Sequence, residues 1–322
     1  MSTSHAEAEV DMTQPASLIL KAGTMKIHEE VEKSKGATHL ARGELDREEY
    51  IRCLMMFWHI YHSLEEGLAA NANDNVLTPT YNPALFARAS ALSSDISFLL
   101  GVSDDDSSWK THPTHQTLIS SPSPAFRAYV SRLTHLVEEE PRRLLAHSYI
   151  RYMGDLSGGQ VMKRNIRKAY GLVDKQGTAF YDFGVTGSEG QSKPFTANMG
   201  EVRRIKEWFR DGIDAGVGND VGVKEALLDE ATRAFVLHKN IFDEIKAPSP
   251  KTQKPVAWTP SSMPLGQELE SSKAVSVRSV LAFMLVVGLA RFIIVVGGLS
   301  GSQGYAKLEA VHAWIISTVP ST

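Results

Sequence analysis

The spacing of apolar residues constrains the fold of this chain more than any other feature of its sequence. Over residues 17–242, apolar residues recur at intervals of three and four, and short clusters of Gly, Pro and Ser interrupt them. No segment alternates apolar and polar residues as a half-buried strand does. The sequence therefore predicts an all-α domain, which we assign to residues 17–245.

Capping residues, prolines and glycines divide this pattern into separate helices. The predicted helical ranges are 17–34, 46–67, 81–100, 124–140, 141–171, 198–212 and 222–245. In the second range, one apolar stripe carries Tyr50, Leu54, Phe57, Tyr61 and Leu64. Two stretches, 101–124 and 184–195, have the Gly, Pro, Ser and Asp content of loops.

The chain ends differ from this domain in composition. Residues 1–16 are polar and are predicted to be disordered, without the apolar segment of a secretory signal. Residues 246–278 contain five prolines among Ser, Thr and Lys and are predicted to be a linker. Because residues 1–16 lack a secretory signal, the helical domain is expected in the cytosol.

Residues 279–299 form an almost wholly apolar stretch, long enough at 1.5 Å per residue to cross a hydrocarbon core of about 30 Å. Lys273 and Arg278 precede it, as expected when the larger domain is cytosolic. Arg291 inside the stretch favours the alternative of a buried or interfacial helix. We predict a transmembrane anchor here, followed by a short tail over residues 300–322.

Charge and cysteine content exclude some classes of function. The formal charge of −3 and a pI near 6.4 provide no field to attract nucleic acid, so no nucleic-acid partner is expected. Cys53 is the only cysteine, which rules out an intrachain disulfide and suits a reducing compartment.

One segment points to chemistry. Gly154, Gly158 and Gly159 fall within six residues, although glycine costs about 1 kcal/mol relative to alanine inside a helix. Helical periodicity nevertheless resumes at Val161. Such a helix either ends here or bends around something flat that approaches its backbone. Asp155, set between the glycines, would then be aimed at that ligand.

The run from Gly154 to Gln160 resembles the distal-helix signature of the haem oxygenases, and Tyr149, Arg151 and Tyr152 flank it as in that family. The resemblance extends over residues 17–242. It implies a haem-oxygenase-like helical bundle that holds haem b between a proximal helix and a kinked distal helix. In the family, glycines such as Gly158 and Gly159 let the distal helix bend over the haem.

Residues 20–32 are similar to the proximal helix of the family, and His28 is the matching position for the axial ligand of the haem iron. At helical spacing, His28 shares a face with Lys21 and Glu32. Glu32, one turn further on, is expected to accept the other N–H of the imidazole, which would fix the ligating tautomer.

The resemblance implies roles for several further residues. A distal network that orders water beside bound oxygen is assigned to Tyr61, Tyr129, Arg151, Tyr152 and Asp155. Apolar pocket walls are assigned to Phe235 and Phe242, although ordinary core packing explains them equally well. Lys206 and Arg210, one turn apart, are expected to bind the propionates together with Lys21.

The chain departs from the family at two positions. Gly212 stands where the family often has another basic residue, and His238 stands where animal members have Asn. Gly212 puts the strength of propionate binding in doubt, and His238 implies a different pattern of hydrogen bonds in the distal network.

The implied activity is oxidative cleavage of haem, which is both substrate and cofactor, to biliverdin, CO and ferrous iron. Asp155 would act through ordered water as the proton source. The sequence contains no dinucleotide-binding or P-loop motif. Electrons are therefore expected from NADPH through a separate enzyme, NADPH–cytochrome P450 reductase or a similar one. A biliverdin reductase is a further expected partner, and the expected location is the endoplasmic reticulum membrane.

Three alternatives remain open from the sequence. A haem sensor or carrier on the same fold would keep His28 but would have no use for Asp155. A ferritin-like di-iron enzyme needs paired Glu-x-x-His motifs, and the only one here is Glu309 to His312. A tail-anchored adaptor would bind no cofactor at all.

Overall fold

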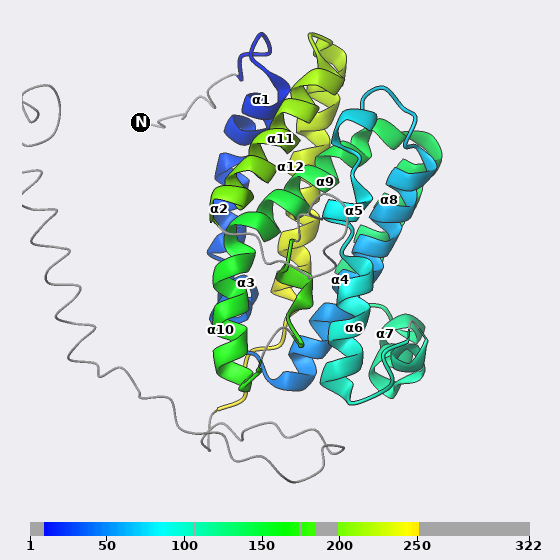
Figure 1. Cartoon of the computed structure of the whole chain (residues 1–322), viewed down its shortest axis with the longest axis vertical. Coiled ribbons are helices and arrows are strands. Elements are labelled where there is room, and N and C mark those ends of the chain that lie inside the picture. Colours follow the sequence, from blue (N-terminus) through cyan, green and yellow to red (C-terminus); the bar gives the residue numbers. More distant parts are fainter. Residues whose placement is uncertain (1–9, 106, 174–175, 184–198, 251–322) are drawn as a thin grey trace, which may run out of the picture. The chain divides into compact units, whose positions relative to one another are not determined.

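The structure, a computed structural model, describes residues 10–105, 107–173, 176–183 and 199–250. These residues form helices and turns, and no strand occurs among them, so the predicted all-α class is confirmed for the described part. Figure 1 shows the α-helices, which are α1 (Ala16–Gly23), α2 (Met25–Glu32), α3 (Lys35–Arg42), α4 (Arg47–Ala70), α5 (Pro83–Phe86), α6 (Ala89–Leu100), α7 (Pro113–Ser120), α8 (Pro124–Glu139), α9 (Leu144–Gly154), α10 (Gln160–Tyr170), α11 (Met199–Val217) and α12 (Val221–Asp243).

Short helical turns connect some of these helices. The 3-10 turns are η1 (Thr78–Thr80), η2 (Ser108–Thr111), η3 (Pro141–Arg143) and η5 (Ala179–Tyr181). A π-helical turn, η4 (Asp155–Gly159), joins α9 to α10, so that these two helices cross the molecule as one long element in Figure 1.

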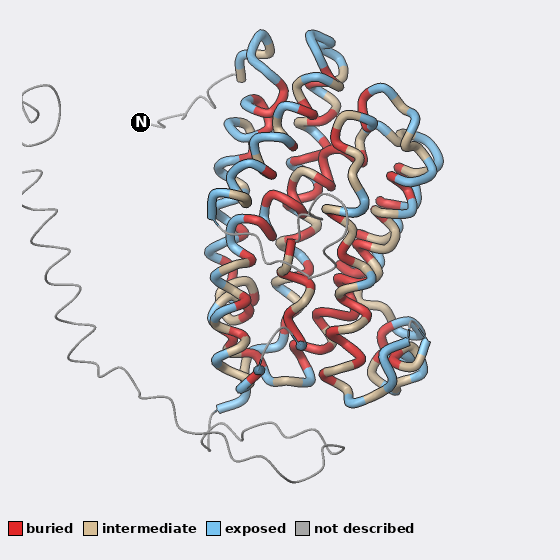
Figure 2. Tube along the Cα trace, in the orientation of Figure 1, coloured by how far each residue is buried: buried red, intermediate tan, exposed pale blue. Residues whose placement is uncertain are grey.

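Helix α4 contributes more buried residues to the core than any other described helix. Its neighbours are α6, α7, α8 and α9. The whole predicted stripe is buried, from Tyr50 to Leu64. Figure 2 shows buried residues on the inward sides of the helices and exposed residues outside, the arrangement that a 3.6-residue period produces.

The single helix predicted over residues 17–34 is wrong. The chain leaves helical geometry at Thr24 and begins α2 at Met25. Ser34 then caps α3 through a hydrogen bond from the Ala37 amide, 3.3 Å long. Gly36 does not end a helix, because it lies inside α3, where a Cβ atom would come within 1.9 Å of the Phe242 carbonyl oxygen. That glycine permits close packing of α3 on α12.

The loop predicted over residues 101–124 is also wrong, because it contains η2 and α7. His112 caps α7 through its side chain, which accepts from the Thr114 amide at 3.3 Å, and Pro113 occupies the first helical position. Trp109 is fully buried in η2, and its Nε1 donates to Ser93 Oγ at 2.7 Å.

Other predicted boundaries need smaller changes. The helix predicted over 81–100 is broken at Ala87 into α5 and α6. The helix predicted to end at Gly212 continues to Val217. Lys246 and Ser249, expected in the linker, donate backbone hydrogen bonds to Glu49 at 2.9 Å and Asp46 at 3.0 Å.

The described residues all belong to one compact unit. The predicted anchor, the C-terminal tail and the connection over 184–195 lie outside the described residues. Among the helices that the structure describes, none combines the length and apolar character of a membrane span.

Candidate active site

The glycine-rich segment forms the π-helical turn η4. Gly154 and Gly159 keep helical backbone angles, so the helix continues through the glycines and does not end there. A Cβ atom added at Gly154 or Gly158 would meet nothing within 4 Å, whereas one at Gly159 would lie 3.1 Å from the Tyr181 ring. Two of the three glycines therefore present bare backbone to open space, and π-helical turns of this kind are frequent at functional sites.

Asp155 lies buried at the first position of this turn, with 9% exposure. The Tyr61 hydroxyl donates a hydrogen bond to its Oδ2. Burial raises the pKa of Asp155, and Arg151, Tyr61 and Arg88 oppose that effect. A carboxyl group held in this way can give or accept a proton beside a ligand on the glycine face.

Arg151, on α9, is a buried cation one helical turn before Asp155. Its guanidinium lies over the Tyr61 ring at 4.6 Å and the Phe57 ring at 4.9 Å. Burial alone would lower the pKa of Arg151, but Tyr61 and Asp155 outweigh it and raise the pKa. Its Nε is buried without a hydrogen-bond partner among the described residues. A buried donor without a protein acceptor needs another acceptor, and an ordered water molecule can provide one.

His238 enters the site from α12. Its Nε2 contacts the Arg151 guanidinium, and its Nδ1 lies 3.3 Å from the Tyr129 hydroxyl. Burial lowers the pKa of His238 far below the usual value, and the charge of Arg151 lowers it further. The structure thus places Tyr129, His238, Arg151 and Tyr61 in one series of contacts that ends at Asp155.

His28 lies on α2 in a very different environment. Its side chain is 51% exposed, and its ring packs edge-on against Phe235 with centroids 5.6 Å apart. Glu32 Oε1 lies 3.8 Å from His28 Nε2, which is too far for the expected hydrogen bond. The structure therefore places Glu32 beside His28 without the predicted bond.

Two of the three predicted cations, Lys206 and Arg210, lie one turn apart on α11, and the third, Lys21, lies on the neighbouring helix α1. Ser17 binds Asp214 through its amide and its hydroxyl, both at 2.8 Å, and the two helices run antiparallel (Figure 1). Lys21, one turn after Ser17, therefore lies toward Arg210, one turn before Asp214. Arg210 lowers the pKa of Lys206 in addition to the effect of burial, so these two charges are also close.

Tyr149 of α9 also lies near this cation group, because the charge of Arg210 acts on its hydroxyl and opposes the rise in pKa that burial causes. Among the described residues, no carboxylate forms an ion pair with Lys206 or Arg210. Unpaired cations beside a tyrosine suit an anionic ligand such as a propionate.

The two departures from the family have different outcomes. A Cβ atom at Gly212 would lie 2.6 Å from the Pro79 carbonyl oxygen, so this glycine allows α11 to pack on η1 and could not hold a long basic side chain here. His238 is part of the distal network, as described above. Phe242 packs against His238 and Phe57, whereas Phe235 packs against His28.

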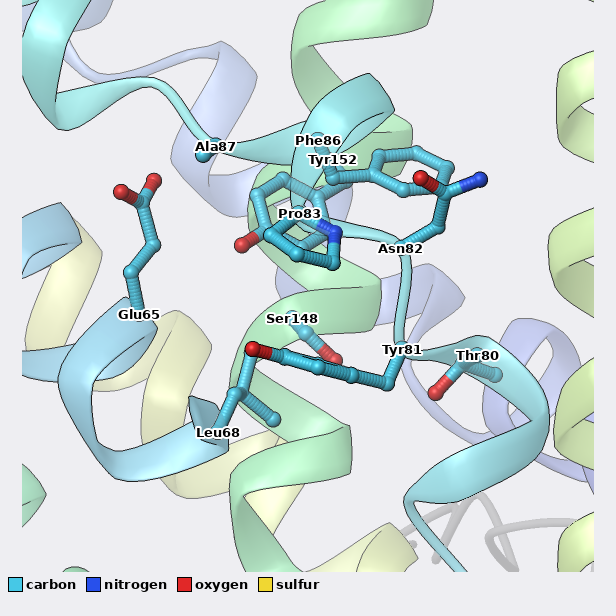
Figure 3. Close-up of a pocket in the computed structure, with 10 residues that line it drawn as sticks. All are labelled: Glu65, Leu68, Thr80, Tyr81, Asn82, Pro83, Phe86, Ala87, Ser148 and Tyr152. Atoms are coloured by element: carbon cyan, nitrogen blue, oxygen red, sulfur yellow. The ribbon is translucent and has the colours of Figure 1, made fainter. Parts of the chain in front are cut away.

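Tyr152, the remaining predicted residue, faces a small cavity between α4, α5 and α9 (Figure 3). The cavity has a volume of about 30 Å³, enough for a water molecule, and is bordered by Glu65, Tyr81 and Ser148. Glu65 accepts hydrogen bonds from the backbone amides of Arg88 at 2.6 Å and Ala89 at 3.2 Å. Burial raises the pKa of Glu65 to about 7.

The sequence did not reveal several titratable residues around the site, namely the buried His147, Glu230 and Arg88 and the partly buried Glu65. One signal was available for Glu230, which stands on the same helical stripe as Leu227, Ala234 and His238. An acid on an otherwise buried stripe requires a buried partner.

The residues present fit a haem group. His28 offers one half-exposed imidazole, Gly154 and Gly158 leave space for a flat ring, and Lys206 and Arg210 are available for carboxylates. The orphaned Nε of Arg151 lies on the side where distal water is expected. Among the described residues there is no cluster of three or more His, Cys, Asp or Glu side chains that could hold a free metal ion.

Comparisons with known proteins agree with this geometry. Residues 14–244 match the family model described as "Heme oxygenase". "Heme oxygenase 1" of Pongo abelii is 31% identical over 236 residues, which are 73% of each chain. "Heme oxygenase" of Pyropia yezoensis is 31% identical over 232 residues, 72% of this chain and 86% of the relative.

Solved structures give the same result. Heme oxygenase from Leptospira interrogans superposes with a TM-score of 0.59 at 32% identity and covers 72% of this chain and 100% of its own. Heme oxygenase-1 from Synechocystis in complex with heme gives a TM-score of 0.57 at 27% identity, with 72% of this chain and 93% of that chain covered.

Proposed function

The chain belongs to the haem oxygenase family and degrades haem, and from this premise we propose that it converts haem b and O₂ to biliverdin, CO and ferrous iron. The observation that carries the proposal is the buried Asp155 on a glycine-framed π-helical turn, hydrogen-bonded to Tyr61. A haem carrier would gain nothing from a buried acid at this position, because burying an ionisable carboxyl group costs stability.

His28 would bind the haem iron. Its surroundings support this role. Phe235 packs against one edge of the ring, and no hydrogen bond from the described residues occupies the ring nitrogens. Bound haem would supply the iron that activates O₂ and the ring that is cleaved. Lys206 and Arg210, with Lys21, would hold the propionates and so set the rotation of the haem in its site.

Asp155 would hold and move protons on the distal side. Tyr61 donates to one carboxylate oxygen, which leaves the other oxygen able to bind water. Burial raises the pKa of Asp155, so the group is a better proton donor near neutral pH than an exposed aspartate. Arg151, with one unpartnered N–H, would hold a second point of the same water network.

Electrons would come from NADPH through NADPH–cytochrome P450 reductase or a similar enzyme, and a biliverdin reductase would take up the product. The absence of a nucleotide-binding motif in the sequence supports a separate electron donor.

The apolar stretch over residues 279–299 would anchor the chain in the endoplasmic reticulum membrane, with the helical domain in the cytosol. The proline-rich segment before it supports this arrangement, because it is a suitable tether. Fractionation of the full chain and of a chain ending at Pro250 tests the proposal. Only the full chain should sediment with membranes after a high-salt wash, and equal release of both chains would contradict an anchor.

The proposed reaction is tested with the full chain in detergent, supplied with haem, NADPH and a purified reductase. We expect biliverdin absorbance to appear and CO to be trapped in a stoichiometry of one per haem. Haem that stays intact while the reductase consumes NADPH would contradict the proposed reaction.

A further inference from the structure

A row of buried side chains continues from Arg151 away from Asp155. Beyond His238, the Tyr129 hydroxyl lies 3.4 Å from His147 Nδ1, and His147 Nε2 lies 3.0 Å from Glu230 Oε1. We define the distal chain as these five residues in order: Arg151, His238, Tyr129, His147 and Glu230. All five are buried.

The two ends of the distal chain are charged and chemically fixed. Arg151 can only donate hydrogen bonds. Glu230 stays ionised, because hydrogen bonds from His147 and Arg132 outweigh its burial and bring its pKa to about 2. Arg132 Nε donates to Glu230 at 3.0 Å, and Arg143 lies 3.6 Å from the same carboxylate. An ionised carboxylate can only accept.

These ends leave one consistent arrangement of hydrogens. Because Arg151 donates to His238 Nε2, that histidine carries its hydrogen on Nδ1 and donates to the Tyr129 oxygen. Because Glu230 accepts from His147 Nε2, His147 accepts from Tyr129 at Nδ1. The two histidines therefore hold opposite tautomers, and every hydrogen bond points from Arg151 toward Glu230.

Two further observations agree with this direction. Burial lowers the pKa of both His147 and His238, so each ring is neutral and has one acceptor nitrogen. The Ala234 carbonyl, one turn earlier on α12, also accepts from His238. Because Nε2 faces Arg151, this carbonyl and the Tyr129 oxygen share the single hydrogen on Nδ1, which agrees with the tautomer assigned to His238.

We propose that His238 is a positioning residue for the proton chemistry of Asp155, acting through Arg151 as the inner link of the distal chain. The two rings beneath the Arg151 guanidinium, Phe57 and Tyr61, fix its depth, and His238 adds a polar contact at its end. Held by His238, it stays over the Tyr61 ring, and Tyr61 in turn donates to Asp155. The directed chain thus connects a largely buried ion-pair group around Glu230 to the acid at the centre of the site.

The proposal rests on the proposed function, but its first test does not need haem. The full chain is prepared with ¹⁵N-labelled histidine, and long-range ¹H–¹⁵N spectra report which nitrogen of each buried ring carries hydrogen. We expect hydrogen on Nδ1 of His238 and on Nε2 of His147 at neutral pH. The same tautomer in both rings, or a doubly protonated ring, would overturn the directed chain.

The second test asks whether the chain acts as one unit. Tyr129→Phe removes the central hydroxyl with little change in volume, and His238→Leu removes the inner link. Each should lower the rate of biliverdin formation about tenfold, a cost typical of removing a residue that orients a catalytic group. The double variant should be no slower than either single variant, because each already breaks the chain.

Independent, multiplicative losses in the double variant would overturn the proposal, as would wild-type rates in both single variants. His238→Asn should recover part of the rate, since an amide provides both an acceptor and a donor. His135→Gln is the matched control, because His135 is 51% exposed and lies outside the distal chain. If the wild-type chain shows the expected tautomers but makes no biliverdin, the proposed function fails and the distal chain stands.

Discussion

The two sides of the haem site are built in opposite ways. On α2, the His28 side chain is 51% exposed, and its nearest carboxylate lies 3.8 Å away. On α9 and η4, Arg151 and Asp155 are 6% and 9% exposed, and both contact Tyr61. The proximal side has few contacts around its key residue, and the distal side has many.

This contrast separates binding from chemistry. A half-exposed histidine gains a firm position only when a ligand supplies a bond, so the proximal side mainly determines whether haem binds. A buried acid that is hydrogen-bonded to Tyr61 has its position determined by the protein itself. Removal of the key residue should therefore affect haem binding on one side and turnover on the other.

The largest expected effect tests the proximal side. His28→Ala should fold, because the side chain is largely exposed and contributes little to the core. It should lose the histidine-ligated haem spectrum and all measurable turnover, and added imidazole should restore part of both. Absorption spectra of the haem complex with and without imidazole measure this outcome. An unchanged Soret band would show that another residue binds the iron.

The distal side should respond differently. Asp155→Ala should leave haem affinity almost unchanged and slow biliverdin formation by about 10²-fold, the usual cost of losing one positioned acid or donor. Single-turnover absorbance of the haem complex gives the rate, and haem titration gives the affinity. Asp155→Asn should retain part of the rate, because an amide still orders water. A large loss of haem affinity with an unchanged single-turnover rate would reverse the contrast between the two sides.

The sequence predicted those parts of the fold that follow from local periodicity. Helices α4, α8 and α12 have bounds within a few residues of the prediction, because their apolar stripes are long and their ends carry recognisable caps. It missed α3, since Gly36 looks like a helix end and its packing on the Phe242 carbonyl cannot be seen in one dimension. It missed α7 because the polar composition of that segment conceals a histidine cap.

The same distinction applies to the site. The glycine run and its aspartate could be found from the sequence because they are contiguous. The link from Arg151 to Glu230 joins α8, α9 and α12, and only the fold brings these residues together. The expected hydrogen bond from His28 to Glu32 illustrates the opposite error, because helical spacing places the pair on one face but does not fix the distance.

A smaller effect concerns the predicted propionate-binding cations Lys21, Lys206 and Arg210, which lie on α1 and α11. Arg210→Ala should weaken haem binding about tenfold, because one charge-assisted hydrogen bond to a propionate is lost at a partly exposed site. Arg203→Ala on the same helix is a matched control, since Arg203 is 80% exposed and paired with Glu207. Haem titrations at low and high salt measure both, and equal losses in the two variants would argue against a specific propionate site.

The smallest expected effect tests how far the buried character of the distal side extends behind Tyr152. The pKa of Glu65 is raised from 4.5 to about 7 because the group is buried beside the cavity, so the folded state favours its neutral form. A raised folded pKa contributes stability that is complete below pH 4.5 and is lost as pH rises toward 7. The wild-type chain should therefore lose on the order of 1–2 kcal/mol of unfolding free energy relative to Glu65→Gln across this interval.

Urea unfolding of both chains at several pH values measures the difference, with Glu66→Gln as the control because its side chain is 69% exposed. The cavity also contacts Tyr152 and Ser148, which do not titrate in this interval, and the nearby charge of Arg88 lowers the pKa of Glu65 in part. If Glu65→Gln and Glu66→Gln showed the same pH dependence as the wild-type chain, Glu65 would titrate like a surface group. The buried character of the distal side would then be limited to Asp155 and the residues that contact it. The contrast with the exposed His28 would apply to Asp155 alone and not to the distal side as a whole.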